Sequence, residues 1–250
     1  NLYLAAVYFF LHFQYNGWFI FTILGLMFEK LEDLRVFQPT LKKIFLLFAL
    51  ACVPAYFLSA LWMPMPFIVY LMVVLAAIMQ VAGWIWTIAV IRKKRALLKS
   101  QAAPFPYTII MLSMVALTVK LLLQLGSTIP SLSTLAFGFR PIVIGYLHLV
   151  LLGVVSLFIL GYSMYAGALE VSTKSKTGIV IFITGIILNE LVLMIQGIAA
   201  MDYVAIPYSN EALFLIALLM FSGLFIMNWH GTTGSRSFRA SAGNPMPVKQ

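Results

Sequence analysis

The sequence predicts an all-α fold, a polytopic membrane bundle of transmembrane helices. Hydrophobic residues make up 63% of the 250 residues and charged residues only 9%, whereas roughly a quarter of a soluble domain is charged. The apolar residues form long continuous runs, which favours helices over the short alternating strands of a membrane barrel. Basic residues collect in alternate connections between these runs. Together these three observations predict a helical integral membrane protein.

The number of spans follows from the length of the apolar runs, because a spanning helix needs about 20 residues. Seven segments meet this requirement. In chain order they are 3–28, 43–62, 66–91, 107–125, 141–167, 178–200 and 212–229. Prolines mark several of their boundaries, since proline cannot continue a helix past its first turn. These prolines are Pro39, Pro64, Pro66, Pro104, Pro106, Pro130 and Pro141.

The charges predict the orientation of these spans. With seven spans, fourteen of the sixteen basic residues fall on one side, Arg140 falls on the other, and Lys120 lies within a span. The positive-inside rule makes the basic side cytoplasmic. We therefore expect a cytoplasmic C-terminus in a bacterial inner (plasma) membrane. This bias also accounts for the net charge of +9 without nucleic-acid binding, so we expect no nucleic acid as a partner. The expected partners are the lipid bilayer and other membrane subunits.

The domain organisation is simple. Residues 1–230 form the predicted bundle, and residues 231–250, rich in Gly, Ser, Pro and basic residues, form a flexible cytoplasmic tail. The chain opens inside an apolar run without an initiator Met or a signal-peptide pattern. We therefore expect the bundle to be N-terminally incomplete. The outer stretch 127–141 is polar and then apolar, and is expected either to lie along the interface or to cap a site.

Two of the predicted spans share a sparse pattern: His, Gly five residues later, then Ile-Leu-Gly. The two copies are offset by 136 residues, which predicts an internal repeat of four helices. They are His12, Gly17 and 23–25, and His148, Gly153 and 159–161. At about 100° per residue the glycines lie opposite the histidine. Small residues on one face allow close helix approach, so each copy is expected to have a glycine packing face.

The paired histidines are the main candidates for chemistry. His12 and His148 fall on helices of the same direction at similar predicted depth, and neutral imidazole is a common metal and haem ligand. Two such residues could hold a haem iron from both sides. The alternative is that each imidazole simply bonds a neighbouring helix. The single cysteine, Cys52, excludes an intrachain disulfide and a cysteine metal site.

Two further ionisable residues lie within the predicted spans. Lys120 either extends its ammonium group to the outer headgroups or neutralises an acidic group, such as a haem propionate, as part of the cofactor site. Glu190 is a candidate proton-relay residue, because an intramembrane carboxylate is costly and usually functional. The alternative is a protonated acid bonded to a neighbouring helix. The side chains of Gln14, Asn16, Gln80, Gln124 and Gln196 are expected to form hydrogen bonds between helices.

The histidine helices resemble those of the haem-copper oxidase subunit I superfamily, in a degenerate form, and of the related NnrS-type membrane proteins. The resemblance rests on the sequence Tyr146-Leu147-His148 with Gly153 after it, and on four-helix units with inward histidines. It implies a twelve-helix fold and a haem cofactor. The second span carries no histidine and His148 stands alone. A three-histidine copper site cannot be assembled, so copper is not expected.

Three functional hypotheses follow. The first is a membrane haem- or metal-binding protein of degenerate haem-copper type, with His12 and His148 as ligands and a role in electron transfer or small-gas sensing. The second is a proton-coupled transporter or channel in which Glu190 and Lys120 line the path. The third is a non-catalytic subunit of a membrane complex. No phosphate-binding glycine loop, zinc helix or nucleophile elbow is present, so we predict no particular enzymatic reaction.

Overall fold

The computed structural model describes residues 2–229, except the side chains of Leu2 and of residues 135–137. It confirms the all-helical class, with 86% helix and no strand in the part of the chain that it describes. The predicted tail, 231–250, lies outside the described residues. Within residues 2–229, five helical rods are long and apolar enough to cross a membrane. They are α4 (Phe67–Gln101), α5 (Pro104–Gly126), the rod Arg140–Tyr165, α9 (Thr173–Met201) and α10 (Ser209–Asn228).

A sixth candidate span is bent. Helix α3 (Gln38–Cys52) and the 3₁₀ helix η2 (Pro54–Ala60) meet at an angle of 46°. Pro54 explains the break, because it lacks the backbone N–H that an α-helix needs and clashes with the preceding turn. The chain therefore continues as the tighter 3₁₀ form and reaches Ala60, two residues short of the predicted end of this span.

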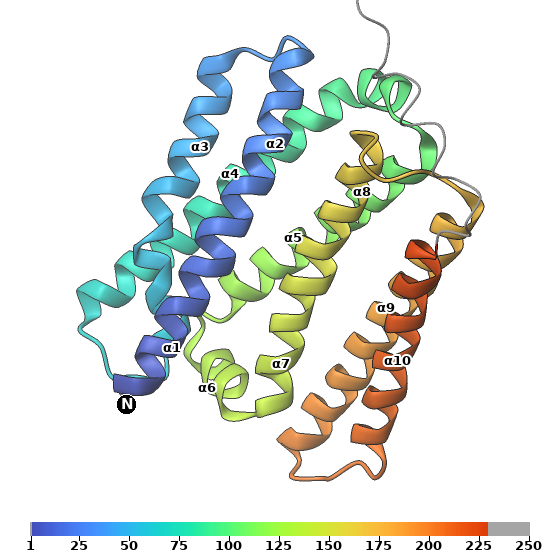
Figure 1. Ribbon diagram of the computed structural model, residues 1–250. Coiled ribbons are helices and arrows are strands. Elements are labelled where there is room, and N and C mark those ends of the chain that lie inside the picture. Colours follow the sequence, from blue (N-terminus) through green and yellow to red (C-terminus); the bar gives the residue numbers. More distant parts are fainter. Residues whose placement is uncertain (1, 230–250) are drawn as a thin grey trace, which may run out of the picture.

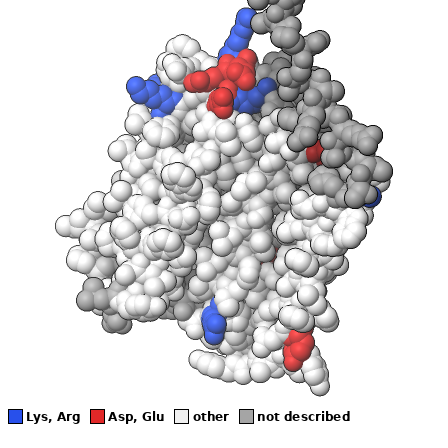
Figure 2. All heavy atoms as spheres, in the orientation of Figure 1, with Lys and Arg blue, Asp and Glu red and all other residues white. Residues whose placement is uncertain are grey.

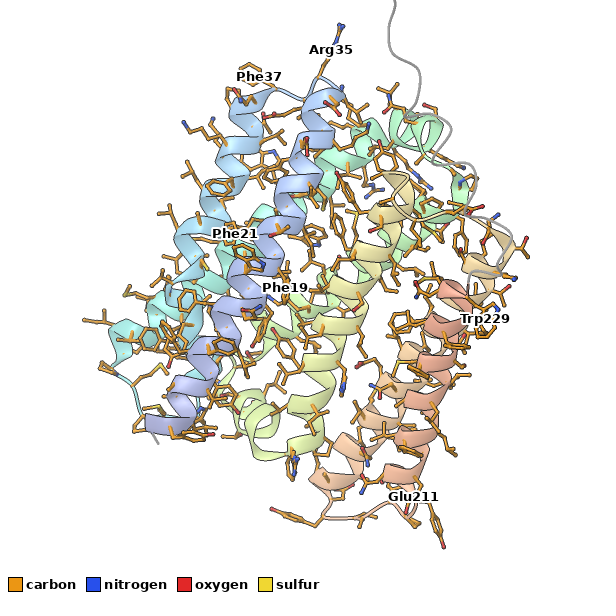
Figure 3. The ribbon with its side chains drawn as sticks, in the orientation of Figure 1. Phe19, Phe21, Arg35, Phe37, Glu211 and Trp229 are labelled. Carbon is orange, nitrogen blue, oxygen red and sulfur yellow. The ribbon has the colours of Figure 1, made fainter. Side chains whose placement is uncertain are left out.

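The first predicted span contains three consecutive helical segments. They are α1 (Leu2–His12), the π-helix η1 (Phe13–Phe19) and α2 (Ile20–Asp33). They follow one another without a break, although each alone is too short to cross a bilayer. Figure 3 shows Phe19 and Phe21 near the middle of this rod and Arg35 beyond its end. The count of seven spans accordingly stays a prediction.

The rods form one bundle with a paired hairpin at its side (Figure 1). The largest buried cluster joins α2, α3, α4 and α5 to the rod Arg140–Tyr165, with Leu24, Ile44 and Trp84 among its members. Helices α9 and α10 pack along each other, and Gly178 and Gly223 face one another so closely that an added Cβ at either would meet backbone. Such small-residue contacts substitute for the hydrophobic effect, which does not drive helix association in lipid.

Charged side chains lie mainly at one end of the bundle. In Figure 2 blue and red groups gather at the end that carries the turn between α2 and α3, while the middle of the face in view is almost uncharged. Arg35 lies at this end and Glu211 at the opposite end (Figure 3). We call them the Arg35 end and the Glu211 end. This placement agrees with the charge bias expected from the sequence; which end faces the cytoplasm stays a prediction.

The two histidine helices share an unexpected feature, a π-helical segment that begins directly after the histidine. The segment η1 begins at Phe13, and η3 (Leu149–Ser156) begins at Leu149, between α7 (Arg140–His148) and α8 (Leu157–Tyr165). The two start points differ by the same 136 residues as the sequence pattern. A π segment inserts an extra residue into the turn and is often found at functional sites. The predicted four-helix repeat as a whole stays a prediction.

The expected glycine packing face is present in one copy and absent in the other. Gly153 and Gly161 are buried against α5, with Ala116 and Ile110 as neighbours. Gly17 and Gly25, by contrast, meet no other helix within 4 Å of the position a Cβ would take.

The expected glycine packing face was wrong for this first copy. Helical geometry places the glycines on one face of their helix, but it does not determine whether another helix packs against that face. The uniform rotation of 100° per residue also fails across the π segment, whose i→i+5 hydrogen bonds widen the turn. The contact of Gly161 with α5 is a property of the tertiary structure.

The equivalent glycines therefore provide a matched test. We expect Gly161→Ala to lower the free energy of unfolding by about 1–3 kcal/mol, the usual cost of overpacking, because its Cβ would lie 2.8 Å from Ile110 Cγ1 and 3.1 Å from the Ile110 backbone nitrogen. Gly25→Ala should be neutral or stabilising, since alanine favours helix over glycine. Unfolding in detergent measures both. Equal effects would contradict the observed packing.

Candidate functional site

His12 belongs to a buried polar cluster and is only 1% exposed. Its Nε2 lies 2.9 Å from the backbone carbonyl of Cys52, and its Nδ1 lies 3.2 Å from the Asn16 side-chain nitrogen. A carbonyl can only accept, so Nε2 carries the proton and donates to Cys52. Nδ1 then accepts from Asn16, which is one turn further along the helix. His12 is thus held as a single neutral tautomer with both nitrogens engaged.

The carbonyl that receives His12 is available because of the break between α3 and η2. In a continued α-helix the N–H of Tyr56 would donate to the carbonyl of Cys52, four residues back. In the 3₁₀ segment it donates to Val53 at 3.1 Å instead. The proline-induced change from α to 3₁₀ therefore frees the half-buried carbonyl of Cys52, and His12 donates to it.

Lys120 joins the same cluster from α5. Its side chain is 1% exposed, so the snorkelling alternative does not describe it. The ammonium nitrogen donates to the side-chain oxygens of Asn16 and Gln124, each at 2.5 Å. Gln124 in turn donates to Gln80 on α4 at 2.9 Å. The expected bonds between helices are confirmed for Asn16, Gln80 and Gln124. Gln14, which is exposed, and Gln196 form no such bond in the described structure, so the expectation was wrong for these two.

Every hydrogen bond in this cluster points away from Lys120. Asn16 and Gln124 each turn their oxygen toward the ammonium group and pass their N–H to a further acceptor, His12 or Gln80. Both amide dipoles are therefore oriented to stabilise a positive charge. The only ion pair among the described residues joins Lys30 and Asp33, so no carboxylate of the described chain neutralises Lys120. Removing an unpaired ion from water is costly, and among residues 2–229 the two amide oxygens compensate for this cost.

A cavity of about 450 Å³ adjoins this cluster. This volume lies within the range of small-molecule sites, about 300–1,000 Å³. Asn16 and Gln124, the two residues bonded to Lys120, form part of its wall together with His12. Other polar lining residues come from several elements. They are Tyr8, Tyr15, Ser59, Ser127 and Tyr146.

The position of the cavity is set by helix ends. Ser127 follows the last residue of α5 and Met201 ends α9, which places the cavity toward the Glu211 end. Leu132 of the short helix α6 (Pro130–Gly138) also lines it. The stretch 127–141 thus contributes to the cavity wall, in agreement with the second of its two predicted roles, and the remaining wall is largely apolar.

His148 does not share the environment of His12. It is half-buried, and its Nδ1 is buried without a hydrogen-bond partner in the described structure. The cause lies one turn along the helix. The residue four positions after His12 is Asn16, whereas the residue four positions after His148 is Leu152, which cannot donate a hydrogen bond.

Glu190 lies apart from the polar cavity, on the face of α9 that packs on α7. Its Oε2 is 3.9 Å from the position that a Cβ on Gly145 would take. Its Oε1 and the neighbouring Asn189 Nδ2 are buried without partners among the described residues. Buried orphan atoms of this kind are rare in native proteins. The relay role of Glu190 stays a prediction, as does its alternative.

The structure thus joins two of the four predicted site residues. His12 and Lys120 meet through Asn16, while His148 and Glu190 lie on other helices and outside the cavity lining. Within residues 2–229 no group of three or more His, Cys, Asp or Glu side chains could hold a metal ion. From the sequence, Asn16 and Gln124 were expected to form hydrogen bonds between helices but were not assigned to the site. Their spacing of four residues from His12 and from Lys120 is a signal that both belong to the site.

The cluster makes a clear prediction for stability. Asn16→Leu removes an acceptor from a buried ammonium group and the donor to His12, so we expect the free energy of unfolding to fall by about 2–4 kcal/mol. Gln14→Leu, two residues earlier and exposed, is the matched control and should change little. Thermal unfolding in detergent measures both. If Asn16→Leu were as stable as the control, the cluster would not contribute to the fold.

Comparisons with known proteins returned no match. No family model matches this chain, and no curated protein or solved structure is significantly similar to it. The resemblance to the haem-copper oxidase superfamily is therefore neither supported nor contradicted by them. The function proposed below for this protein therefore rests on the residues of its own chain.

Proposed function

We propose that this protein is a membrane receptor or carrier for an amphipathic acidic ligand, bound in the polar cavity. The carrying observation is that Lys120 is buried, surrounded by amide oxygens and unpaired with any carboxylate of the described residues. A ligand with a negative group would supply the missing counter-charge.

The cavity wall favours such a ligand in two ways. Asn16 and Gln124 separate the ammonium group from the cavity and are bonded to it, so the charge lies directly behind this wall. Charges interact more strongly in an apolar protein interior than in water. The lining residues Leu58, Ile142 and Leu147 are apolar, which suits the hydrocarbon part of an amphipathic molecule.

The proposal predicts charge-selective binding. Dodecanoate should displace tritiated dodecanoate from the purified protein at least tenfold better than dodecanol does, because an attraction of about 1.4 kcal/mol between the carboxylate and the charge behind the cavity wall changes affinity tenfold. Lys120→Met should abolish this preference. Scintillation proximity binding measures both. Equal competition by the acid and the alcohol in the native protein would overturn the proposal.

A second pair of variants tests the same cavity independently, in case the Lys120→Met variant does not fold. Leu123 lines the cavity, whereas Leu112 on the same helix does not; both side chains are exposed, Leu123 by 52% and Leu112 by 39%. Leu123→Trp should fill the cavity and weaken binding of both competitors. Leu112→Trp should leave binding unchanged. Equal binding by the two variants would place the ligand elsewhere.

Haem binding, with a role in electron transfer or gas sensing, is the second candidate, and the orphan Nδ1 of His148 favours it. A haem would supply a redox-active iron, and Lys120 could face a propionate. His12 fits this role less well, because ligation would have to break one of its two hydrogen bonds.

The haem candidate has a direct test in the absorption spectrum of the purified protein. We expect a Soret band that His148→Ala removes or shifts, because loss of an axial ligand changes the electronic state of the iron. His12→Ala is the comparison that shows whether both histidines take part. Absence of a Soret band after haem loading, or a band unchanged in both variants, would exclude the candidate.

A further inference from the structure

Besides the polar cavity, the bundle has a surface groove between α4 and α5, near the Arg35 end. Its volume is about 300 Å³, and it shares no lining residue with the polar cavity. Helix α4 contributes Ile88, Ile91, Arg92 and Arg95. Helix α5 contributes the stripe Tyr107, Met111, Met114, Val115 and Thr118. The groove is therefore apolar along its length and basic at one end.

The two arginines can converge on one ligand group. Arg92 and Arg95 are three residues apart, so they occupy the same face of α4 with Cβ atoms about 5–6 Å apart. Neither belongs to an ion pair among the described residues, where the only such pair is Lys30–Asp33. Guanidinium groups bind phosphate through paired hydrogen bonds. The basic end thus matches a phosphate group in charge and in shape.

The remainder of the groove suits a hydrocarbon chain. At its deep end the Thr118 hydroxyl accepts a hydrogen bond from Trp84 Nε1 and donates to the Met114 carbonyl, both at 2.9 Å. The polar atom at this end is therefore already satisfied within the protein. The stripe from Tyr107 to Thr118 rises about 16 Å along α5, which is enough for much of one acyl chain.

We propose that the α4–α5 groove binds an anionic phospholipid, with its phosphate at Arg92 and Arg95 and one acyl chain along α5. Basic pockets between transmembrane helices near the membrane surface recognise anionic headgroups. The charge of this groove, its apolar length and its place at the end of two spanning helices all match that class of lipid. The site is independent of the ligand proposed for the polar cavity.

The chain offers a control of equal charge for this site. Arg92→Gln with Arg95→Gln removes two charges that line the groove. Lys93→Gln with Lys94→Gln removes two charges from the intervening residues, which do not line it. Native mass spectrometry of the full chain, titrated with dioleoyl phosphatidylglycerol, compares their affinities. We expect at least a tenfold loss in the arginine variant and less than a twofold change in the lysine variant.

Two further arms distinguish a lipid site from diffuse charge attraction and from a bare phosphate site. Dioleoyl phosphatidylcholine should bind the native protein at least tenfold more weakly than phosphatidylglycerol, and glycerol 3-phosphate should not displace the lipid at millimolar concentration. Val115→Phe, which narrows the groove without changing charge, should also weaken phosphatidylglycerol binding.

Equal losses in the arginine and lysine variants would show diffuse charge attraction. Displacement by glycerol 3-phosphate would show a phosphate site without the acyl chain. Either result overturns the proposal.

Discussion

The arrangement of this protein depends on a buried ammonium group that is stabilised by amide dipoles instead of a carboxylate. Lys120 donates to Asn16 and Gln124, and these two residues carry the hydrogen bonds outward to His12 and Gln80. The cluster fixes α5 against the first rod and against α4. Each amide has one acceptor directed toward the charge and one donor directed away. Loss of any member leaves a polar atom unpaired in an apolar medium, where the cost is greatest.

The same cluster links local chain geometry to a functional site. Pro54 ends α3 and makes the chain continue as a 3₁₀ helix, which exposes the carbonyl of Cys52 to His12. The π segment that follows His12 carries Asn16 on the next turn. Two departures from the regular α-helix therefore build one wall of the polar cavity. Irregular backbone is tolerated at membrane depth where it is buried in protein.

The two histidine helices show how one pattern can serve two environments. Both contain a π segment directly after the histidine, yet Asn16 satisfies His12 while Leu152 leaves His148 Nδ1 without a donor. The residue one turn after each histidine therefore decides whether the Nδ1 atom has a hydrogen-bond partner in the described structure. Their glycines differ as well, since Gly161 packs on α5, whereas no described atom of another helix lies within 4 Å of the Cβ position at Gly25.

Composition, apolar run length and the positions of proline determined the class of this protein, because backbone satisfaction in lipid leaves few alternatives to long helices. They also identified Lys120 and His12 as unusual, since a polar side chain in a span is costly wherever it points. Only the tertiary structure decided which of these residues meet. The i, i+4 spacing put Asn16 beside His12, but the approach of α5 to the first rod brought Lys120 to them and separated His148 and Glu190. Such approaches depend on packing between helices far apart in sequence, which no local pattern encodes.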